Sequence, residues 1–207
     1  MEIISYSLGP LETNAFFLVG EEEFFVVDAP EGCWEKVKQF SEDTGKRCEG
    51  LLLTHGHWDH IADLPCFNEA KLSIWAHKGD RDLIENPGLM SSFLPFPVDL
   101  VPGKVDQWVE DGEKLDLSIG EAKVLHVPGH APGNIAFWFS DEQVVFGGDA
   151  LFSGSIGRYD LPNGDGALLS RSIQDKLFSL PDVTVVYPGH GPETTVGREK
   201  LQNPFFQ

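Results

Sequence analysis

The residues best suited to chemistry lie in one short segment, Thr54-His55-Gly56-His57-Trp58-Asp59-His60. Side chains two positions apart in an extended backbone point the same way, so His55 and His57 can face one metal ion. The turn that follows would direct Asp59 and His60 towards a second ion, because four ligands are too many for one open tetrahedral site. Gly56 would let the backbone bend tightly between the first two histidines.

Three further segments each end a strand with glycine and then a side chain of ligand type: Val127-Pro128-Gly129-His130, Phe146-Gly147-Gly148-Asp149 and Tyr187-Pro188-Gly189-His190. Such strand ends can converge at one sheet edge, so we expect His130, Asp149 and His190 to join the His55 segment. Imidazole and carboxylate groups without thiolate favour zinc, iron or manganese. Solvated loop histidines are the alternative, and the crowding of these residue types disfavours it.

These segments need secondary-structure elements to position them, and the hydrophobic pattern indicates which. The expected strands are Ile3–Leu8, Asn14–Val19, Glu23–Asp28, Glu49–Thr54, Lys71–Ala76, Lys114–Ser118, Glu121–Val127, Asn134–Phe139, Gln143–Gly147 and Val183–Tyr187. The expected helices are Glu31–Thr44, which would end at Gly45, Lys78–Glu85 and Ala167–Leu180. We expect residues 86–104 to form a loop. Meanders that alternate with helices predict two sheets packed face to face, with helices outside.

The composition is typical of one folded domain over residues 1–207. The formal net charge of −18 would repel phosphate backbones, so we expect a small-molecule substrate and no nucleic acid partner. Three widely spaced cysteines, Cys33, Cys48 and Cys66, indicate no disulfide framework and fit a reducing cytoplasm. No leader pattern and no apolar stretch of membrane-spanning length is present, so we expect a cytoplasmic protein without a membrane partner.

The ligand pattern resembles the metallo-β-lactamase superfamily over nearly the whole chain, in the order His55-x-His57-x-Asp59-His60, His130, Asp149, His190. The resemblance implies an α+β fold, a four-layer αββα sandwich. It also implies two divalent metal ions, with zinc expected and iron or manganese as alternatives. By motif position, Asp149 would bridge the ions, one of which would be bound by His55, His57 and His130 and the other by Asp59, His60 and His190.

Two further stretches resemble short bacterial hydrolases of the glyoxalase II (hydroxyacylglutathione hydrolase) type. They are residues 148–158, with Gly148-Asp149-Ala150-Leu151-Phe152 and Ser155-Ile156-Gly157-Arg158, and residues 187–205, with Tyr187-Pro188-Gly189-His190-Gly191-Pro192, Thr194-Thr195-Val196-Gly197 and Asn203-Pro204-Phe205. This resemblance implies a small thioester substrate such as an S-hydroxyacylglutathione. β-Lactamases of this fold generally have cysteine at the position of Asp149, so β-lactamase activity is disfavoured for this protein. Glyoxalase II also carries a C-terminal helical domain that helps bind glutathione, and we expect no such domain here, since the sequence ends at Gln207, shortly after His190.

The expected mechanism follows from two metal ions that share a water. Such a pair, about 3.5–4 Å apart, lowers the pKa of the water from 15.7 towards about 7, so metal-bound hydroxide is the expected nucleophile. Asp59 is the expected catalytic residue, because a carboxylate beside this water can orient it or accept its proton. A thiolate leaves without protonation, so the absence of an evident general acid favours thioesters over amides.

The remaining polar residues have less specific expectations. Asp28, at a strand end, is expected to support the ligand loop by hydrogen bonds. His77 and His126 are expected to be structural or exposed, because the ligand set is complete without them. The apolar stretch of residues 90–97 would be a lid, a subunit contact or part of the core.

The residues that bind the substrate are not indicated by the sequence. Arg158 would either bind a substrate carboxylate or form an ion pair with Asp160 or Asp165. Three alternatives to a thioesterase stay open: a persulfide dioxygenase-like oxidoreductase of the same fold with one iron, a hydrolase of lactones or other esters, and a binding module in which the metal only stabilises the fold. The sequence leaves the native metal, the acyl group and the oligomeric state open.

Overall fold

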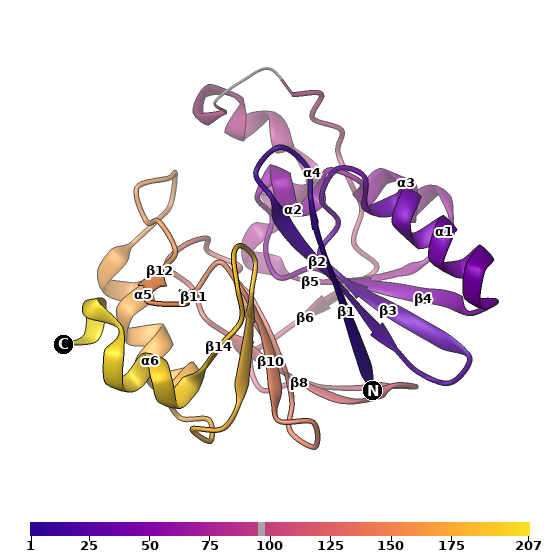
Figure 1. The fold of residues 1–207 in the computed structure, drawn as a ribbon. Helices are drawn as coiled ribbons and strands as arrows, with labels where there is room; N and C mark the ends of the chain where they lie inside the picture. The colour runs from indigo at the N-terminus through magenta and orange to yellow at the C-terminus, as the bar shows by residue number, and fades with distance from the viewer. Residues whose placement is uncertain (95–97) are drawn as a thin grey trace.

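The computed structural model describes residues 1–94 and 98–207, and its centre is a pair of six-stranded sheets (Figure 1). The strands of the first sheet lie in chain order: β1 (Glu2–Leu8), β2 (Thr13–Val19), β3 (Glu23–Val27), β4 (Arg47–Leu52), β5 (Ser73–His77) and β6 (Gln107–Val109). Its first three strands are antiparallel, and β3 to β6 are parallel. The carboxyl ends of β3, β4 and β5 therefore meet at one edge.

The second sheet has the order β14-β13-β10-β9-β8-β7. Its strands are β7 (Lys114–Leu117), β8 (Gly120–His126), β9 (Ile135–Phe139), β10 (Val144–Gly148), β13 (Val185–Pro188) and β14 (Thr194–Thr195), and a separate hairpin pairs β11 (Leu151–Phe152) with β12 (Ser155–Ile156). Only β10 and β13 are parallel neighbours in this sheet, so the residues that follow these two strands emerge side by side.

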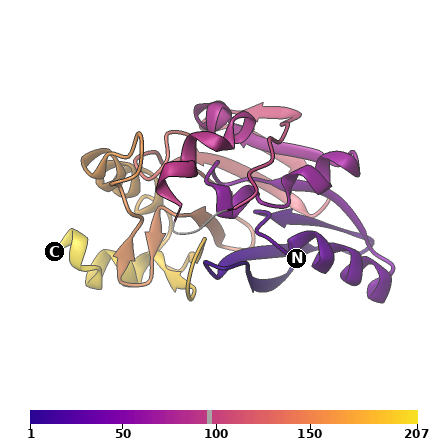
Figure 2. The same cartoon turned by 90° about the horizontal axis from the view of Figure 1, so that it is seen from above.

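Helices cover the outer faces of both sheets (Figures 1 and 2). Helices α1 (Cys33–Thr44) and α3 (Leu64–Glu69) lie on the first sheet, and α5 (Gly166–Ser172) and α6 (Val196–Gln202) lie on the second. The short elements are α2 (Trp58–Ile61), α4 (Arg81–Glu85), the 3-10 turns η1 (Lys78–Asp80), η2 (Pro87–Phe93) and η4 (Pro204–Phe206), and the π-helical turn η3 (Ile173–Leu177). The predicted four-layer αββα sandwich is therefore confirmed.

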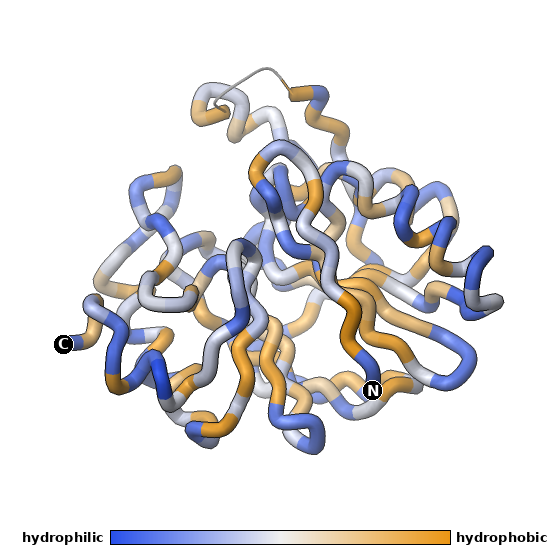
Figure 3. The backbone as a smooth tube through the Cα atoms, viewed as in Figure 1, coloured by the Kyte–Doolittle hydropathy of each residue, from blue (hydrophilic) through white to orange (hydrophobic). Residues whose placement is uncertain are grey.

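Apolar side chains fill the three spaces between these layers, and the strands are the hydrophobic part of the chain (Figure 3). Strand β2 is buried on both faces: Phe16 points into the space between the sheets, and Phe17 points into the space under the helices. Each fully buried phenylalanine contributes about 1.5–3 kcal/mol relative to exposure. A strand buried on both faces reads as a continuous apolar run, which is the pattern of β2.

Most expected elements are confirmed within two or three residues. Helix α1 ends where predicted, with Gly45 in the left-handed conformation at φ 73°. The prediction of a loop throughout residues 86–104 is wrong in part, because Pro87 opens the 3-10 turn η2. The predicted helix Ala167–Leu180 stops being α-helical after Ser172.

In the apolar stretch of residues 90–97, Met90 is buried and Phe93 is half-exposed. The part of that prediction that concerns Pro95, Phe96 and Pro97 lies outside the described residues. The three cysteines are free, without a disulfide. Among residues 1–94 and 98–207, no helix has the length and apolar character needed to cross a bilayer.

Candidate metal centre

The histidine-rich segment leaves the carboxyl end of β4 in an extended conformation and then turns into α2. His57 is the residue before this helix, with φ −69° and ψ 145°. The predicted separation of His55 and His57 from Asp59 and His60 is only partial, because the rings of His55 and His60 lie with centroids 4.1 Å apart and both residues form a third candidate group with Asp149. Gly56 has no positive φ, so its role differs from the predicted tight bend: a Cβ there would lie 3.0 Å from the Cβ of Asp80.

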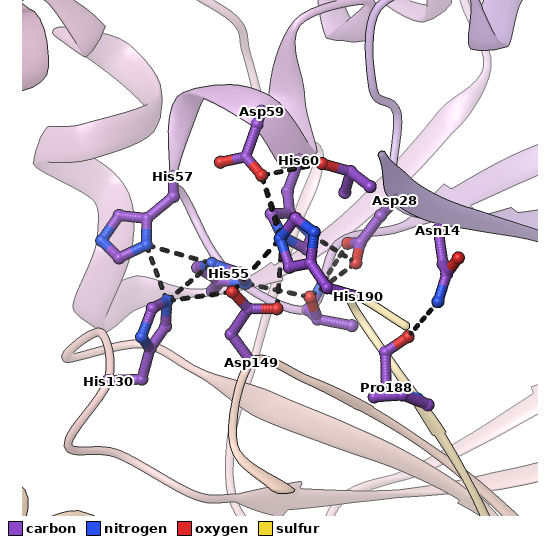
Figure 4. Close-up of polar contacts among 12 residues, drawn as sticks. Asn14, Asp28, His55, His57, Asp59, His60, His130, Asp149, Pro188 and His190 are labelled. Carbon is purple, nitrogen blue, oxygen red and sulfur yellow. Dashed lines mark hydrogen bonds and ion pairs between the residues drawn. The ribbon is translucent and has the colours of Figure 1, made fainter. Parts of the chain in front are cut away.

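The three other predicted residues follow strands of the second sheet, His130 after β8, Asp149 after β10 and His190 after β13. Parallel pairing of β10 with β13 places the last two together, and Gly189 N donates to Gly148 O at 2.9 Å. Gly189 is required there, because a Cβ would lie 2.1 Å from Asp149 Oδ1. The structure thus brings all seven predicted residues to one end of the sandwich (Figure 4).

Three histidine nitrogens meet in the first group. The separations are 3.1 Å from His55 Nε2 to His57 Nδ1, 2.8 Å from His57 Nδ1 to His130 Nε2 and 3.2 Å from His130 Nε2 to His55 Nε2. Tetrahedral zinc at about 2.0–2.1 Å from each nitrogen would set such separations at about 3.3 Å. The triangle is therefore close to the size that one divalent cation requires.

The second group contains carboxylates. Asp59 Oδ2 lies 3.5 Å from His60 Nε2 and 3.2 Å from His190 Nε2. Asp149 Oδ2 lies 3.5 Å from both His130 Nε2 and His190 Nε2, so this oxygen lies between the two groups. That is the position expected of a bridging carboxylate.

The outward-facing nitrogens fix which lone pairs face the centre. His130 Nδ1 donates to Arg158 O at 2.7 Å and His190 Nδ1 donates to Leu11 O at 3.1 Å, because a carbonyl oxygen can only accept. His60 Nδ1 donates to the carboxylate of Asp28 at 2.8 Å. In each ring the Nε2 lone pair is then free for a cation, which is the usual arrangement around ligating histidines.

Three buried atoms of the candidate ligands make no hydrogen bond among the described residues: His57 Nε2, His60 Nε2 and Asp149 Oδ1, the last two 3.4 Å apart. Buried polar atoms are nearly always satisfied, so such orphans need an explanation. Converging lone pairs together with orphaned donor atoms fit a site for two cations, whose natural ligands are imidazole and carboxylate.

Electrostatics differ between the two groups. Burial, followed by the nearby His130, lowers the pKa of His57 to about 3, and burial also lowers the pKa of His55 and His130, so the first group consists of neutral imidazoles. Burial opposes protonation of His190 as well, but Asp149 and Asp59 outweigh it and raise its pKa to about 10. The carboxylates of the second group therefore attract positive charge, and protons compete with metal ions there.

Asp28 makes hydrogen bonds to the candidate ligand loop, as a supporting carboxylate would. Its Oδ2 accepts from His60 Nδ1 at 2.8 Å and from Thr54 Oγ1 at 2.7 Å, while Oδ1 accepts from Thr54 N at 2.8 Å. The Thr54 hydroxyl in turn accepts from His55 Nδ1 at 3.1 Å. One buried carboxylate thus orients a histidine from each group.

Two supporting residues were missed by the sequence reasoning. Thr13 Oγ1 donates to Asp59 Oδ2 at 2.8 Å, and Asn14 Nδ2 donates to Pro188 O and Gly191 O, both at 2.9 Å. Both are buried polar residues at the start of the otherwise apolar strand β2, and that contrast was the available signal.

His77 and His126 are outside the described metal-binding groups, as predicted, and their rings stack on each other with centroids 4.1 Å apart. Arg158 forms the ion pair that was one of its two expected roles, donating to Asp160 at 2.8 and 2.9 Å, and the pair is exposed. Arg158 is also among the residues that line the cavity above the candidate ligands.

This cavity, of about 480 Å³, opens directly on five candidate ligands. The rest of its described wall is mainly apolar: Leu11, Trp58, Met90, Phe93, Phe152, Ser155, Ile156, Arg158 and Leu161. An open hollow of about 570 Å³ beside α3 contains none of the candidate ligands, so it is not the site of the chemistry.

Comparisons with known proteins agree with this geometry. The Metallo-beta-lactamase superfamily profile matches residues 8–190. Hydroxyacylglutathione hydrolase GloC of Haemophilus influenzae is 37% identical over 200 residues, 94% of this chain and 93% of that protein. The crystal structure of BLEG-1 B3 metallo-beta-lactamase has a TM-score of 0.91 at 34% identity and covers 100% of both chains. The crystal structure of TTHA1623 in a di-iron-bound form has a TM-score of 0.86 at 38% identity, over 98% of this chain and 99% of that one.

Fold, ligand geometry and sequence similarity all lead to the same assignment. The profile covers every predicted ligand from His55 to His190. The chain belongs to the metallo-beta-lactamase superfamily and is one of its metal-binding hydrolases.

Proposed function

We propose that this protein hydrolyses small thioesters of the S-hydroxyacylglutathione type at a centre of two divalent metal ions. The observation that carries the proposal is the pair of ligand groups with Asp149 between them, at the floor of the 480 Å³ cavity. When bound, two such ions supply an activated water and a Lewis acid for the carbonyl oxygen.

The ligand residues have distinct roles in this proposal. His55, His57 and His130 present neutral nitrogens to one ion, and Asp59, His60 and His190 present their donor atoms to the other. Thr13 fixes Asp59 Oδ2, whereas Asp59 Oδ1 makes no hydrogen bond among the described residues. Asp59 Oδ1 is therefore the atom placed to orient the attacking water or to accept its proton.

The composition of the cavity wall favours a thioester substrate over an amide substrate. Apart from the candidate ligands and Trp58, its described polar side chains are Ser155 and Arg158, neither of which is an acid suited to protonating an amine. A thiol has a pKa near 8.5 and leaves as thiolate without such help. In this proposal Arg158 exchanges its exposed ion pair with Asp160 for a carboxylate of the thiol half of the substrate, and the apolar wall suits the acyl half.

The relatives support both parts of the proposal. The name of GloC gives the hydroxyacylglutathione hydrolase activity for a protein 37% identical to this one. The di-iron form of TTHA1623 supports a binuclear centre and makes iron a strong alternative to zinc, which the histidine and carboxylate donors also suit. We infer a small-molecule substrate and a single catalytic domain.

The test is an assay of the metal-loaded protein on lactoylglutathione, with release of glutathione thiol as the signal. We expect turnover that is lost in His57→Ala, which removes a ligand nitrogen, and retained in Arg171→Lys on the exposed face of α5. Two metal ions per chain are expected by elemental analysis. Turnover by the unaltered protein no faster than that of His57→Ala would remove this substrate class.

One observation favours a second candidate, hydrolysis of β-lactams: BLEG-1, a B3 metallo-beta-lactamase by its title, shares the fold at a TM-score of 0.91. The same metal-loaded preparation should therefore be assayed on a cephalosporin. Hydrolysis of the cephalosporin but not of lactoylglutathione would select this candidate. The amide of a β-lactam is strained, so it makes a smaller demand on a proton donor than an ordinary amide.

A further inference from the structure

The carboxylate of Asp80 connects the two loops that carry the first ligand group. Asp80 ends the turn η1 after β5 and is 1% exposed. Its Oδ2 accepts from Gly56 N at 2.8 Å, and its Oδ1 accepts from Gly133 N at 2.6 Å. Gly56 lies between His55 and His57, and Gly133 lies three residues after His130.

We propose that Asp80 is a positioning residue, which holds the loop of His55 and His57 in register with the loop of His130 and so shapes the first metal site before a cation binds. The inference rests on the proposed metal centre. Asp80 makes no contact with a ligand ring among the described residues, so it acts only through the backbone, unlike Asp28, which binds His60 directly.

The turn that carries Asp80 packs closely against both loops. A Cβ on Gly133 would lie 2.5 Å from Asp80 N, and a Cβ on Gly56 would lie 3.0 Å from Asp80 Cβ. The adjacent Gly79 is equally close to the second loop, since a Cβ there would lie 2.8 Å from Pro132 O. A side chain would overlap neighbouring atoms at Gly133 and Gly79 and would be tight at Gly56, so the turn contacts both loops directly.

The chemistry of the contact requires a carboxylate. Two N–H groups approach two different oxygens, and an amide side chain could accept only one of them. Burial raises the pKa of Asp80 to about 6, and no cationic side chain among the described residues forms an ion pair with it. A buried carboxylate without a counter-ion is weak evidence for a purely stabilising role, which leaves loop positioning as its contribution.

The test compares two buried carboxylates that both accept backbone N–H groups. Asp80→Asn keeps the size but presents an NH₂ group to one of two backbone N–H groups. The control is Glu199→Gln, at a buried carboxylate away from the metal loops that accepts from Gly154 N at 2.9 Å and from the side chains of Thr194 and Asn203. Zinc affinity is measured by competition with a chromogenic chelator, and stability by thermal melting of the metal-depleted chain. We expect Asp80→Asn to bind the first zinc about 10–100-fold more weakly and Glu199→Gln to bind it as the unaltered protein does.

Equal zinc affinity in Asp80→Asn and the unaltered protein would overturn the inference, whatever the loss of stability. If Asp80→Asn does not fold, hydrogen exchange of the unaltered, metal-depleted chain decides instead. The amides of Gly56 and Gly133 should stay protected without metal, and rapid exchange of both would show that Asp80 does not hold the loops. No zinc binding by the unaltered protein would instead reject the proposed metal centre.

Discussion

Replacing Asp28 by asparagine should weaken the fold and the second metal site together. Asp28 has a φ of 60°, a conformation that asparagine adopts almost as readily as aspartate, so the change adds little backbone strain. The amide has one acceptor oxygen in place of two. Either Thr54 N or His60 Nδ1 then loses its acceptor inside the protein.

The expected magnitude follows from these contacts. A lost hydrogen bond to a charged group costs about 1.5–3 kcal/mol, and a buried donor without a partner costs about 1–3 kcal/mol. Because removal of a buried charge offsets part of this, we expect the free energy of unfolding to fall by about 3 kcal/mol. For a chain of this size that lowers Tm by about 6–12 °C. Loss of His60 orientation should weaken metal binding at the second group about 10–100-fold.

The assay is thermal melting of the metal-depleted chain together with titration of each metal site. Asn163→Ala is the matched control, because Asn163 also has a positive φ, 65°, but is exposed. It should cost only the strain of about 1–2 kcal/mol and leave metal binding unchanged. If Asp28→Asn melted within 2 °C of the unaltered protein and bound both ions normally, the reasoning would be refuted.

Three other predictions can be tested with the same preparations. Burial, followed by the neighbouring His126 and Lys78, lowers the pKa of His77 to about 4 from the ordinary 6.5. Between pH 4 and 6.5 the unfolded state therefore binds one proton more than the folded state. The free energy of unfolding should fall as the pH drops from 6.5 to 4. It should fall less in His77→Asn, whose side-chain oxygen can still accept the Gly79 N–H. Equal dependence of Tm on pH in the two proteins would contradict this. Arg158→Ala should raise KM for lactoylglutathione about tenfold with little change in kcat, because a tenfold change corresponds to the loss of roughly one charge-assisted hydrogen bond. An unchanged KM would show that the thiol half of the substrate does not bind to Arg158. Asp149→Asn should reduce the metal content to one ion or fewer by elemental analysis, and two retained ions would exclude its bridging role.

The candidate ligands could be identified because their residue types are clustered in the sequence. Four ligand-type residues within 55–60 follow an apolar strand, and each of the remaining three follows a strand and a glycine. Burial and period-two patterning then identify the strands that carry them. Strand pairing itself was not predictable, since the contact of β10 with β13 joins residues about forty positions apart.

Short elements were missed for a different reason. Strands β6, β11, β12 and β14 have two or three residues each, too few to show a period, and they are strands only because a neighbour supplies the hydrogen bonds. Helix α6 begins where the side chain of Thr195 accepts a hydrogen bond from Arg198 N. Threonine is a common N-cap residue, so the sequence contains a signal for the start of this helix. Tertiary pairing decides such elements.

The supporting carboxylates show what a better sequence rule would use. Strands β3, β4 and β5 are parallel neighbours, so the residues that follow them lie side by side at one edge. Asp28 follows β3, His55 follows β4 and Asp80 follows β5. The two aspartates therefore flank the ligand loop, accepting from Thr54 N and Gly56 N respectively. The backbone amides of the ligand loop are in reach of an acidic residue that follows a neighbouring parallel strand. Once the strand order is known, this rule predicts Asp80 as well as Asp28.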